Sequence, residues 1–320
     1  MKKQLAGVII VALGMAVWAP PAMSWEKGTH LYIADLLKKH GFMNPGNFDE
    51  MYGAMTPDIF NYVFDLPPGI NAYLYDQTHH NFMALWNSVR WGYEKALAFG
   101  FVSHNDSWGA DFTAHHQGRT FGQAQGYVIA KAQLLSAAID WSSLETAIGG
   151  TLPDQVKLDL CHNIVEAAGD IILKRCYPGF GLKLIAAGSR LGDRFRNLLL
   201  KAYLPGLSAL VGGTNARTII LASETAFRQQ QVVMYGMIMR QDEPKIIEDI
   251  SAQFNLLVGG YLASLEITLP EGTDLTPIIQ AALMGAIQLC ENDYMIEVNA
   301  TVRFVEAQLK AHKVWGSTHH

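Results

Sequence analysis

Apolar residues recur at intervals of three and four along most of this chain, which is the spacing of one face of an α-helix. In segment 29–39, Leu31, Ala34 and Leu37 follow this spacing, and Gly41 supplies a stop. Strand-like alternation is scarce, so the pattern predicts an all-α, multi-helix fold. The predicted helices cover residues 29–39, 80–101, 118–139, 154–174, 217–240, 244–266, 275–292 and 294–312.

Glycine, proline and asparagine separate these helices. Turns or loops are expected at 44–47, 66–69 and 149–153. The chain shows no internal repeat and no low-complexity segment. We therefore expect one helical domain over residues 25–240, with the C-terminal helices of 241–320 packed on the same domain.

The first 24 residues resemble a secretory signal. Lys2 and Lys3 precede an apolar run over 5–18, and Ala22-Met23-Ser24 is a small-x-small cleavage site. Export to the periplasm or the medium is expected, and cleavage after Ser24 makes Trp25 the first residue. This removes two lysines, leaves 296 of the 320 residues and moves the net charge from −5 to about −7. An acidic chain argues against a stable nucleic-acid complex.

Half of the residues are hydrophobic and 17% are charged, which indicates buried helices or contact with lipid. Beyond the signal no segment has the pattern of a membrane span, because charged residues interrupt the run over 185–211. The chain has three cysteines, and Cys161 and Cys176 are the nearest pair. Export permits a disulfide there without requiring one.

The segment 183–228 is locally basic. It carries seven lysines and arginines against Asp193 and Glu224, interleaved with leucine and isoleucine. Such a stretch either contacts an anionic membrane surface or forms a solvated helix face over an apolar core. The basic residues are Lys183, Arg190, Arg194, Arg196, Lys201, Arg217 and Arg228.

Histidines and carboxylates occur at metal-ligand spacings. His162 and Glu166 lie four apart in a predicted helix, and so do Asp111 and His115, so each pair shares one helix face. If segment 101–116 is helical, His104 lies two turns before Asp111 on that face. Imidazole and carboxylate ligands without thiolates are typical of catalytic zinc. Further donors are Asp58, His79 and His80.

The order of these residues after Trp25 resembles the trinuclear zinc phosphoesterases, meaning bacterial zinc-dependent phospholipases C and the related single-strand nucleases. The series covers residues 25 to about 170. It ends in glutamate rather than aspartate at position 166, which is more similar to the phospholipase branch. The series is Trp25, His30, Asp58, His79 or His80, His104, Asp111, His115 or His116, His162 and Glu166.

This resemblance implies an all-helical enzyme with three zinc ions. The Trp25 amine and carbonyl, with His30, would hold one ion. The second would take Asp58, His104 and one of the pair at 79–80. The third would take one of the pair at 115–116 with residues His162 and Glu166. Within each adjacent pair, one histidine is the expected ligand.

A carboxylate would bridge the first two ions, and at this position the chain departs from the family pattern. The family places the bridging aspartate four residues after the histidine, but Trp108 stands there. Asp111 is the preferred bridge because seven residues restore the helix face of His104. Gly109 could break that helix, which leaves Asp106 as the alternative.

The implied activity is hydrolysis of a phosphoric ester by metal-activated water. Asp58 would be the catalytic base or water-orienting group as well as a ligand. The expected substrate is a phospholipid, cleaved to diacylglycerol and a phosphorylated head group. The alternatives are a single-strand nuclease or 3′-nucleotidase on the same metal site, and a non-catalytic exported zinc-binding protein.

We predict that export leaves Trp25 at the N-terminus and that its free amine is needed for full activity, because it would be a zinc ligand. N-terminal sequencing checks the cleavage, and elemental analysis of a form with one extra N-terminal Met checks the amine. An extended form with unchanged zinc content would exclude this ligand.

Overall fold

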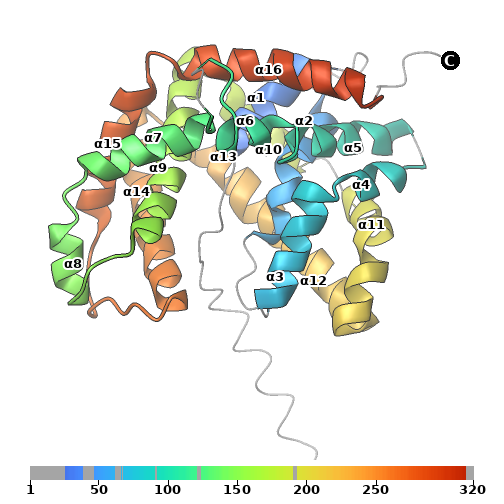
Figure 1. Ribbon diagram of the computed structural model, residues 1–320. Coiled ribbons are helices and arrows are strands. Elements are labelled where there is room, and N and C mark those ends of the chain that lie inside the picture. Colours follow the sequence, from blue (N-terminus) through green and yellow to red (C-terminus); the bar gives the residue numbers. More distant parts are fainter. Residues whose placement is uncertain are drawn as a thin grey trace, which may run out of the picture.

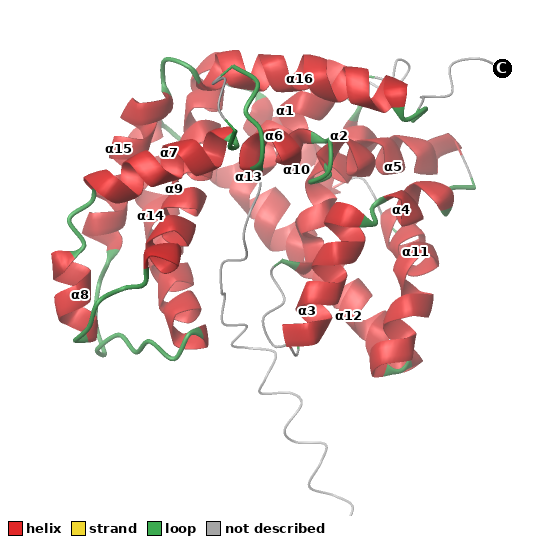
Figure 2. Cartoon of the chain, viewed as in Figure 1, coloured by secondary structure: helices red, strands yellow, loops and turns green. Residues whose placement is uncertain are grey.

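The computed structural model describes residues 26–38, 47–61, 66, 68–90, 92–120, 124–189 and 193–314. Within these ranges it contains helices and no strand, which confirms the all-α prediction for this part of the chain (Figures 1 and 2). The signal segment and Trp25 lie outside the described residues.

In chain order, the first elements are α1 (Lys27–Leu37), α2 (Phe48–Met55), η2 (Thr56–Phe60), α3 (Pro68–Tyr75), η3 (Asp76–His80), α4 (Met83–Asn87), α5 (Gly92–His104), α6 (Ala110–His115), α7 (Tyr127–Ala138) and α8 (Ser142–Ile148). The remainder are α9 (Asp154–Cys176), α10 (Phe180–Ser189), α11 (Arg194–Val211), α12 (Gly213–Ala226), η4 (Phe227–Met234), α13 (Tyr235–Ile238), α14 (Glu243–Ser264), α15 (Thr276–Cys290) and α16 (Tyr294–Ala311).

Helix α9 runs through the interior and organises the packing. Its residues from 160 to 173 are all buried, and it packs against α7, α15, α14, α1 and α16. Asp154 lies in its first turn and Lys174 and Arg175 in its last, which complements the helix dipole. Helix α16 lies across the top of the view and contacts α1, α6 and α9 (Figure 1). The C-terminal helices therefore share a core with the N-terminal ones.

Helices α2 and α5 pack with their backbones in close contact. A Cβ atom on Gly100 would lie 2.0 Å from the carbonyl oxygen of Glu50, and one on Gly53 would lie 2.0 Å from that of Leu97. Only glycine allows this approach, because the obstructing atoms belong to backbone that cannot move alone. The contact sets the distance between the end of α2 and the end of α5, where two of the candidate ligands lie.

The predicted helix over 80–101 is wrong, because the chain forms α4 and α5 in its place. Helix α4 ends at Asn87, and the hydroxyl of Ser88 donates to the carbonyl of Ala84 at 2.8 Å. Glu94 in the first turn of α5 accepts the backbone N–H of Arg90 at 2.7 Å. This side chain therefore caps a second helix where apolar spacing alone suggested continuity.

The predicted helix over 118–139 begins only at Tyr127. Before it, buried Glu297 on α16 accepts the backbone N–H of Thr120 at 2.7 Å and also contacts Arg119. A partner 177 residues away thus removes backbone groups from helix formation. The prediction for 217–240 is closer, since α12, η4 and α13 form one continuous helical run with a π-helical middle.

The cysteines of the described chain are not bridged. Cys161 and Cys176 both lie on α9, and fifteen residues of helix separate their Cα atoms by about 22 Å, far beyond disulfide reach. The third cysteine, Cys290, is buried on α15. Among the described helices, none combines the length and the apolar character needed to cross a bilayer.

Gly100→Ala should lower the free energy of unfolding by about 1–3 kcal/mol, because overpacking must separate α2 from α5. Gly259 on α14 is the matched control, since a Cβ there would meet no atom within 4 Å. Gly259→Ala should raise stability by about 0.5–1 kcal/mol through helix propensity. Urea unfolding midpoints check both, and a neutral Gly100→Ala would contradict the close backbone contact.

Candidate metal centre

Five buried side chains from separate elements converge on one small volume, which we name the first cluster. They are His30 on α1, Asp58 on η2, His79 on η3, His104 on α5 and Asp111 on α6. His104 Nε2 lies 2.9 Å from Asp111 Oδ2, and His30 Nε2 lies 3.3 Å from Asp111 Oδ1. His79 Nε2 lies 3.3 Å from Asp58 Oδ1 and 3.7 Å from Asp111 Oδ2. Asp111 therefore faces three imidazoles.

Local structure presents Asp58 and His79 to this volume. Asp58 follows Pro57 in the first turn of the 3₁₀ helix η2, and its Oδ1 accepts Asn61 Nδ2 at 2.8 Å. His79 lies in the π-helical turn η3, a distortion that often occurs at functional sites. Its ring stacks on Tyr75, with centroids 4.0 Å apart and planes 11° apart.

Neighbouring backbone oxygens set the orientation of the imidazoles. The carbonyl of Ala54 lies 2.8 Å from His104 Nδ1, and because a carbonyl can only accept, Nδ1 carries the proton. The carbonyl of Tyr75 lies 3.2 Å from His79 Nδ1, where the Thr78 hydroxyl also contacts that nitrogen. A ring whose Nε2 has given up its proton would offer the Nε2 lone pair to an ion between the ring and the carboxylates, which is the arrangement of metal-ligating histidines.

The charges of the first cluster are strongly coupled. Burial lowers the pKa of His104, but Asp111 and Asp58 outweigh it and raise that pKa to about 9. Burial and the neighbouring His104 lower the pKa of His30 to about 4. Burial raises the pKa of Asp111, yet the charge of His104 holds it well below its usual range. The carboxylates therefore stay ionised, and they need positive charge beside them.

A second cluster consists of His115 at the end of α6 with His162 and Glu166 on α9. His162 Nε2 lies 3.1 Å from Glu166 Oε1, and the rings of His115 and His162 are 5.1 Å apart. Burial raises the pKa of Glu166 well above its usual value, and Glu26, Asp58 and Asp111 add to the effect. The two clusters are joined, because Asp106, Asp111 and His115 also place ligand atoms within 4.8 Å of one another.

Both clusters fit metal ions. Both carboxylate oxygens of Asp111, both of Glu166 and the Nε2 of His162 are buried without a hydrogen-bond partner. Burying a carboxylate without partners costs several kcal/mol, so such groups are normally paired or bound to metal. Ligand atoms about 2.0–2.1 Å from a tetrahedral zinc lie roughly 3.3 Å apart, which matches the separations within these clusters. Groups of buried histidine and acidic side chains that could hold metal ions are therefore present.

Segment 101–116 is not one helix. Helix α5 ends at His104 because Asn105 Oδ1 accepts the backbone N–H groups of Ser107 and Trp108, each at 2.9 Å. Asp111 nevertheless meets His104, since α6 turns back toward the end of α5. The preference for Asp111 thus rested on a continuous helix that the chain does not form.

Asp106, the alternative bridge, lies beside the second cluster. Its Oδ1 lies 3.2 Å from His115 Nδ1, and its Oδ2 lies 3.0 Å from His116 Nε2. The adjacent histidine pairs separate clearly by burial. His79 is 1% exposed whereas His80 is exposed at the surface, and His115 is 11% exposed whereas His116 is 52% exposed.

Sequence reasoning missed two supports of these clusters. Tyr75, which stacks on His79, carried no signal beyond its position four residues earlier. Asp170 lies four residues after Glu166 and eight after His162, so it continues the same face of α9. That repeated spacing was visible in the sequence and would have identified Asp170 as a residue of the site's surroundings.

Most of the basic residues of segment 183–228 are paired within the protein. Lys183 bonds Asp35, Lys201 contacts Glu94, and Arg196 and Arg228 both contact buried Glu224. Arg190 lies outside the described residues. This pairing reduces the charge that a membrane surface would meet, and it favours the solvated-face interpretation.

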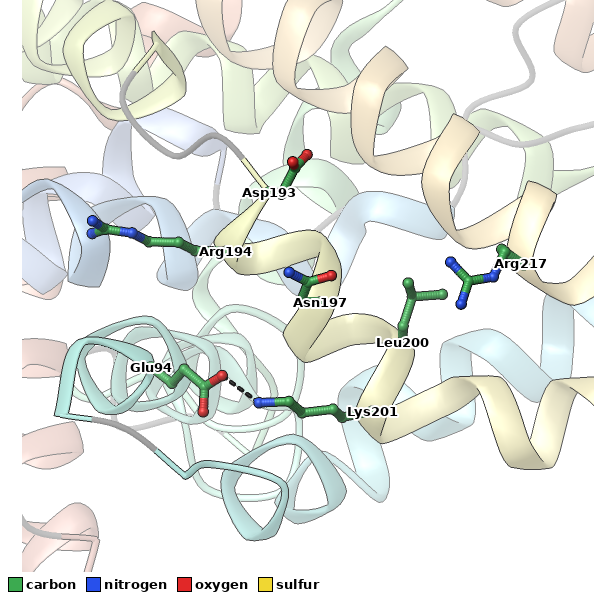
Figure 3. Close-up of a pocket in the computed structure, with 7 residues that line it drawn as sticks. All are labelled: Glu94, Asp193, Arg194, Asn197, Leu200, Lys201 and Arg217. Carbon is green, nitrogen blue, oxygen red and sulfur yellow. Dashed lines mark hydrogen bonds and ion pairs between the residues drawn. The ribbon is translucent and has the colours of Figure 1, made fainter.

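A pocket of about 570 Å³ lies in this region, lined by residues of α5, α11 and α12 with neighbouring Asp193 (Figure 3). Figure 3 shows Arg217 and Asn197 beside it and the Lys201–Glu94 pair at its edge. Its lining includes no residue of either cluster, so it is not part of the candidate metal centre.

Asp111→Asn should release at least one bound metal ion, because it removes charge from the oxygens that face three imidazoles. Asp106→Asn is the control. Asp106 faces His115 of the second cluster and solvent-exposed His116, so its replacement should have a smaller effect on metal content. Elemental analysis of freshly purified proteins compares them. The reverse ranking would identify Asp106 as the bridge.

Zinc binding to the metal-free protein at pH 7 should release protons. His104, with a pKa near 9, is protonated there, and burial raises the pKa of Glu166, which favours its protonated form. Both must lose protons to ligate, so the apparent zinc affinity should rise with pH up to about 9. Calorimetry in two buffers of different ionisation enthalpy measures the release, and none at pH 7 would contradict these assignments.

Comparison with known proteins identifies no relative. No protein-family model, no curated protein and no solved structure matches this chain. The functional interpretation therefore depends on the ordered ligand series and on the geometry of the two clusters.

Proposed function

We propose that this chain is an exported, zinc-dependent phosphoric ester hydrolase of the phospholipase C type. The observation that carries the proposal is a set of buried carboxylates that face imidazole nitrogens at metal-ligand spacing. Among these carboxylates, both oxygens of Asp111 and both of Glu166 have no hydrogen-bond partner. Trinuclear zinc phosphoesterases, which the ligand order resembles, use such a set.

Three zinc ions would be held by the two clusters. Asp58, His79 and His104 would hold one ion, and His30 with Trp25 would hold another. Asp111 would serve both, because its two oxygens face different imidazoles. The second cluster would hold the third ion. Bound zinc ions acidify water toward neutral pH and neutralise charge on phosphoryl oxygens.

The chain's own residues would orient the reaction. Burial raises the pKa of Asp58, but His104 and His79 outweigh it and lower the pKa, so this carboxylate is ionised at neutral pH. Asn61 holds its Oδ1 at 2.8 Å, which fixes the side chain to orient a water. The substrate would approach beside His115 and His116, where the clusters come nearest to solvent.

Trp108 and Trp141 give little support for a nuclease over a phospholipase C. Nucleases stack bases on exposed aromatic rings. Trp108 stacks on His312 and contacts Phe82, and Trp141 donates to the carbonyl of Ser136. Trp108 and Trp141 are thus used in packing, and together with Glu166, which the phospholipase branch shares, this favours a phospholipid as the proposed substrate.

The mature protein should contain two to three zinc ions and hydrolyse a chromogenic phosphocholine ester, with activity lost to a chelator and restored by zinc. His79→Asn should lower turnover by more than about 100-fold, the upper end for loss of an outer-shell partner. His80→Asn is the control, because this exposed neighbour lies outside the first cluster.

Three results would redirect the proposal. Less than one transition metal per chain would exclude the family assignment. Preferential cleavage of single-stranded DNA in a parallel assay would identify the nuclease alternative. Zinc binding without hydrolysis of either substrate would indicate a non-catalytic zinc-binding protein.

A further inference from the structure

A fully buried carboxylate behind the first cluster holds the start of α1. Asp170 Oδ2 accepts the backbone N–H of Gly28 at 2.7 Å and the hydroxyl of Tyr235 at 3.0 Å. Its Oδ1 accepts the hydroxyl of Thr29 at 2.8 Å. The first backbone N–H groups of a helix have no partner within that helix, so Asp170 acts as a cap supplied from α9.

The surrounding residues are shaped for this contact. A Cβ on Gly28 would lie 2.5 Å from Asp170 Oδ2, and one on Gly169 would lie 2.3 Å from the Tyr294 ring. The hydroxyls of Tyr294 and Thr29 are also in contact. Glycine at position 28 lets α1 reach the carboxylate, and glycine at position 169 lets Tyr294 of α16 pack beside it against Thr29, so the first turn of α1 is held against α9.

That first turn determines where His30 lies. His30 directly follows Thr29, and the backbone N–H groups of both donate to the carbonyl of Glu26, at 3.1 and 3.0 Å. Glu26 is buried, and residue 25 precedes it directly in the chain. Among the described residues of α1, His30 is the one that belongs to the first cluster. The position of its imidazole therefore depends on this turn.

We propose that Asp170 is a positioning residue that fixes the first turn of α1 and thereby sets the affinity of the zinc subsite containing His30. The inference rests on the proposed function. Asp170 lies on the same helix as His162 and Glu166, so α9 ligates one subsite directly and aligns another through three hydrogen bonds.

Asp170→Asn tests this in the full mature chain. The amide keeps the size of the side chain but turns a donor toward one of the three groups that donate to it. Zinc titration of the metal-free protein should show one ion bound at least tenfold more weakly and the others unchanged. Hydrogen exchange at residues 27–31 should be faster in the metal-free variant.

Glu224→Gln is the matched control. Glu224 is equally buried and accepts three hydrogen bonds, all from side chains, but its partners are Tyr52, Arg196 and Arg228 rather than the start of α1. It should lose stability and keep its zinc profile. Tyr235→Phe removes one bond to Asp170 with little change of shape, so it provides a milder test if Asp170→Asn folds poorly.

The outcomes separate the two proposals. If the wild-type protein binds zinc and both Asp170→Asn and Tyr235→Phe bind it with the same affinities, the positioning role is overturned. Equal weakening of every ion, matched by Glu224→Gln, would also overturn it, because the effect would then be general destabilisation. A wild-type protein that binds no zinc would overturn the proposed function itself.

Discussion

The interior of this protein is organised by buried negative charge that needs a cation. Asp58, Asp111 and Glu166 are almost fully buried, and imidazole rings are the principal groups facing them. In the metal-free protein a proton on His104 partly neutralises the first cluster, and burial raises the pKa of Glu166, which favours its uncharged form there. Metal ions bound between these groups would balance their charge and complete their coordination.

The fold meets this constraint by bringing short, separate elements to the long helix α9. Candidate ligands from α1, η2, η3, α5 and α6 meet beside two further candidates on α9 itself. Close contacts at Gly28, Gly53 and Gly100 set the spacing between these elements to the level of single atoms. Packing of this kind is stiff, which keeps like charges close together despite their repulsion.

The hydrogen bonds around the site divide the work between neighbouring groups. Backbone carbonyls of Ala54 and Tyr75 orient imidazoles, and Asp170 holds the turn that carries His30. Elsewhere, Glu224 and Glu297 anchor other segments in the same way, each as a buried carboxylate with several donors. A buried carboxylate with several hydrogen-bond donors thus has a structural role, whereas one without such donors is available to bind a metal ion.

The sequence determined what depends on local spacing. The all-α class, the extent of α9 and the shared face of His162 and Glu166 follow from a period of 3.6 residues, which acts within one helix. The breaks at Ser88 and Asn105 were harder to predict, because at each place one polar side chain bonds the local backbone where the helix ends. Only the tertiary structure decided that His79 rather than His80 enters the first cluster, that Asp111 faces three imidazoles, and that Asp170 holds α1. These outcomes depend on contacts between residues up to 142 positions apart, whose geometry no local pattern contains.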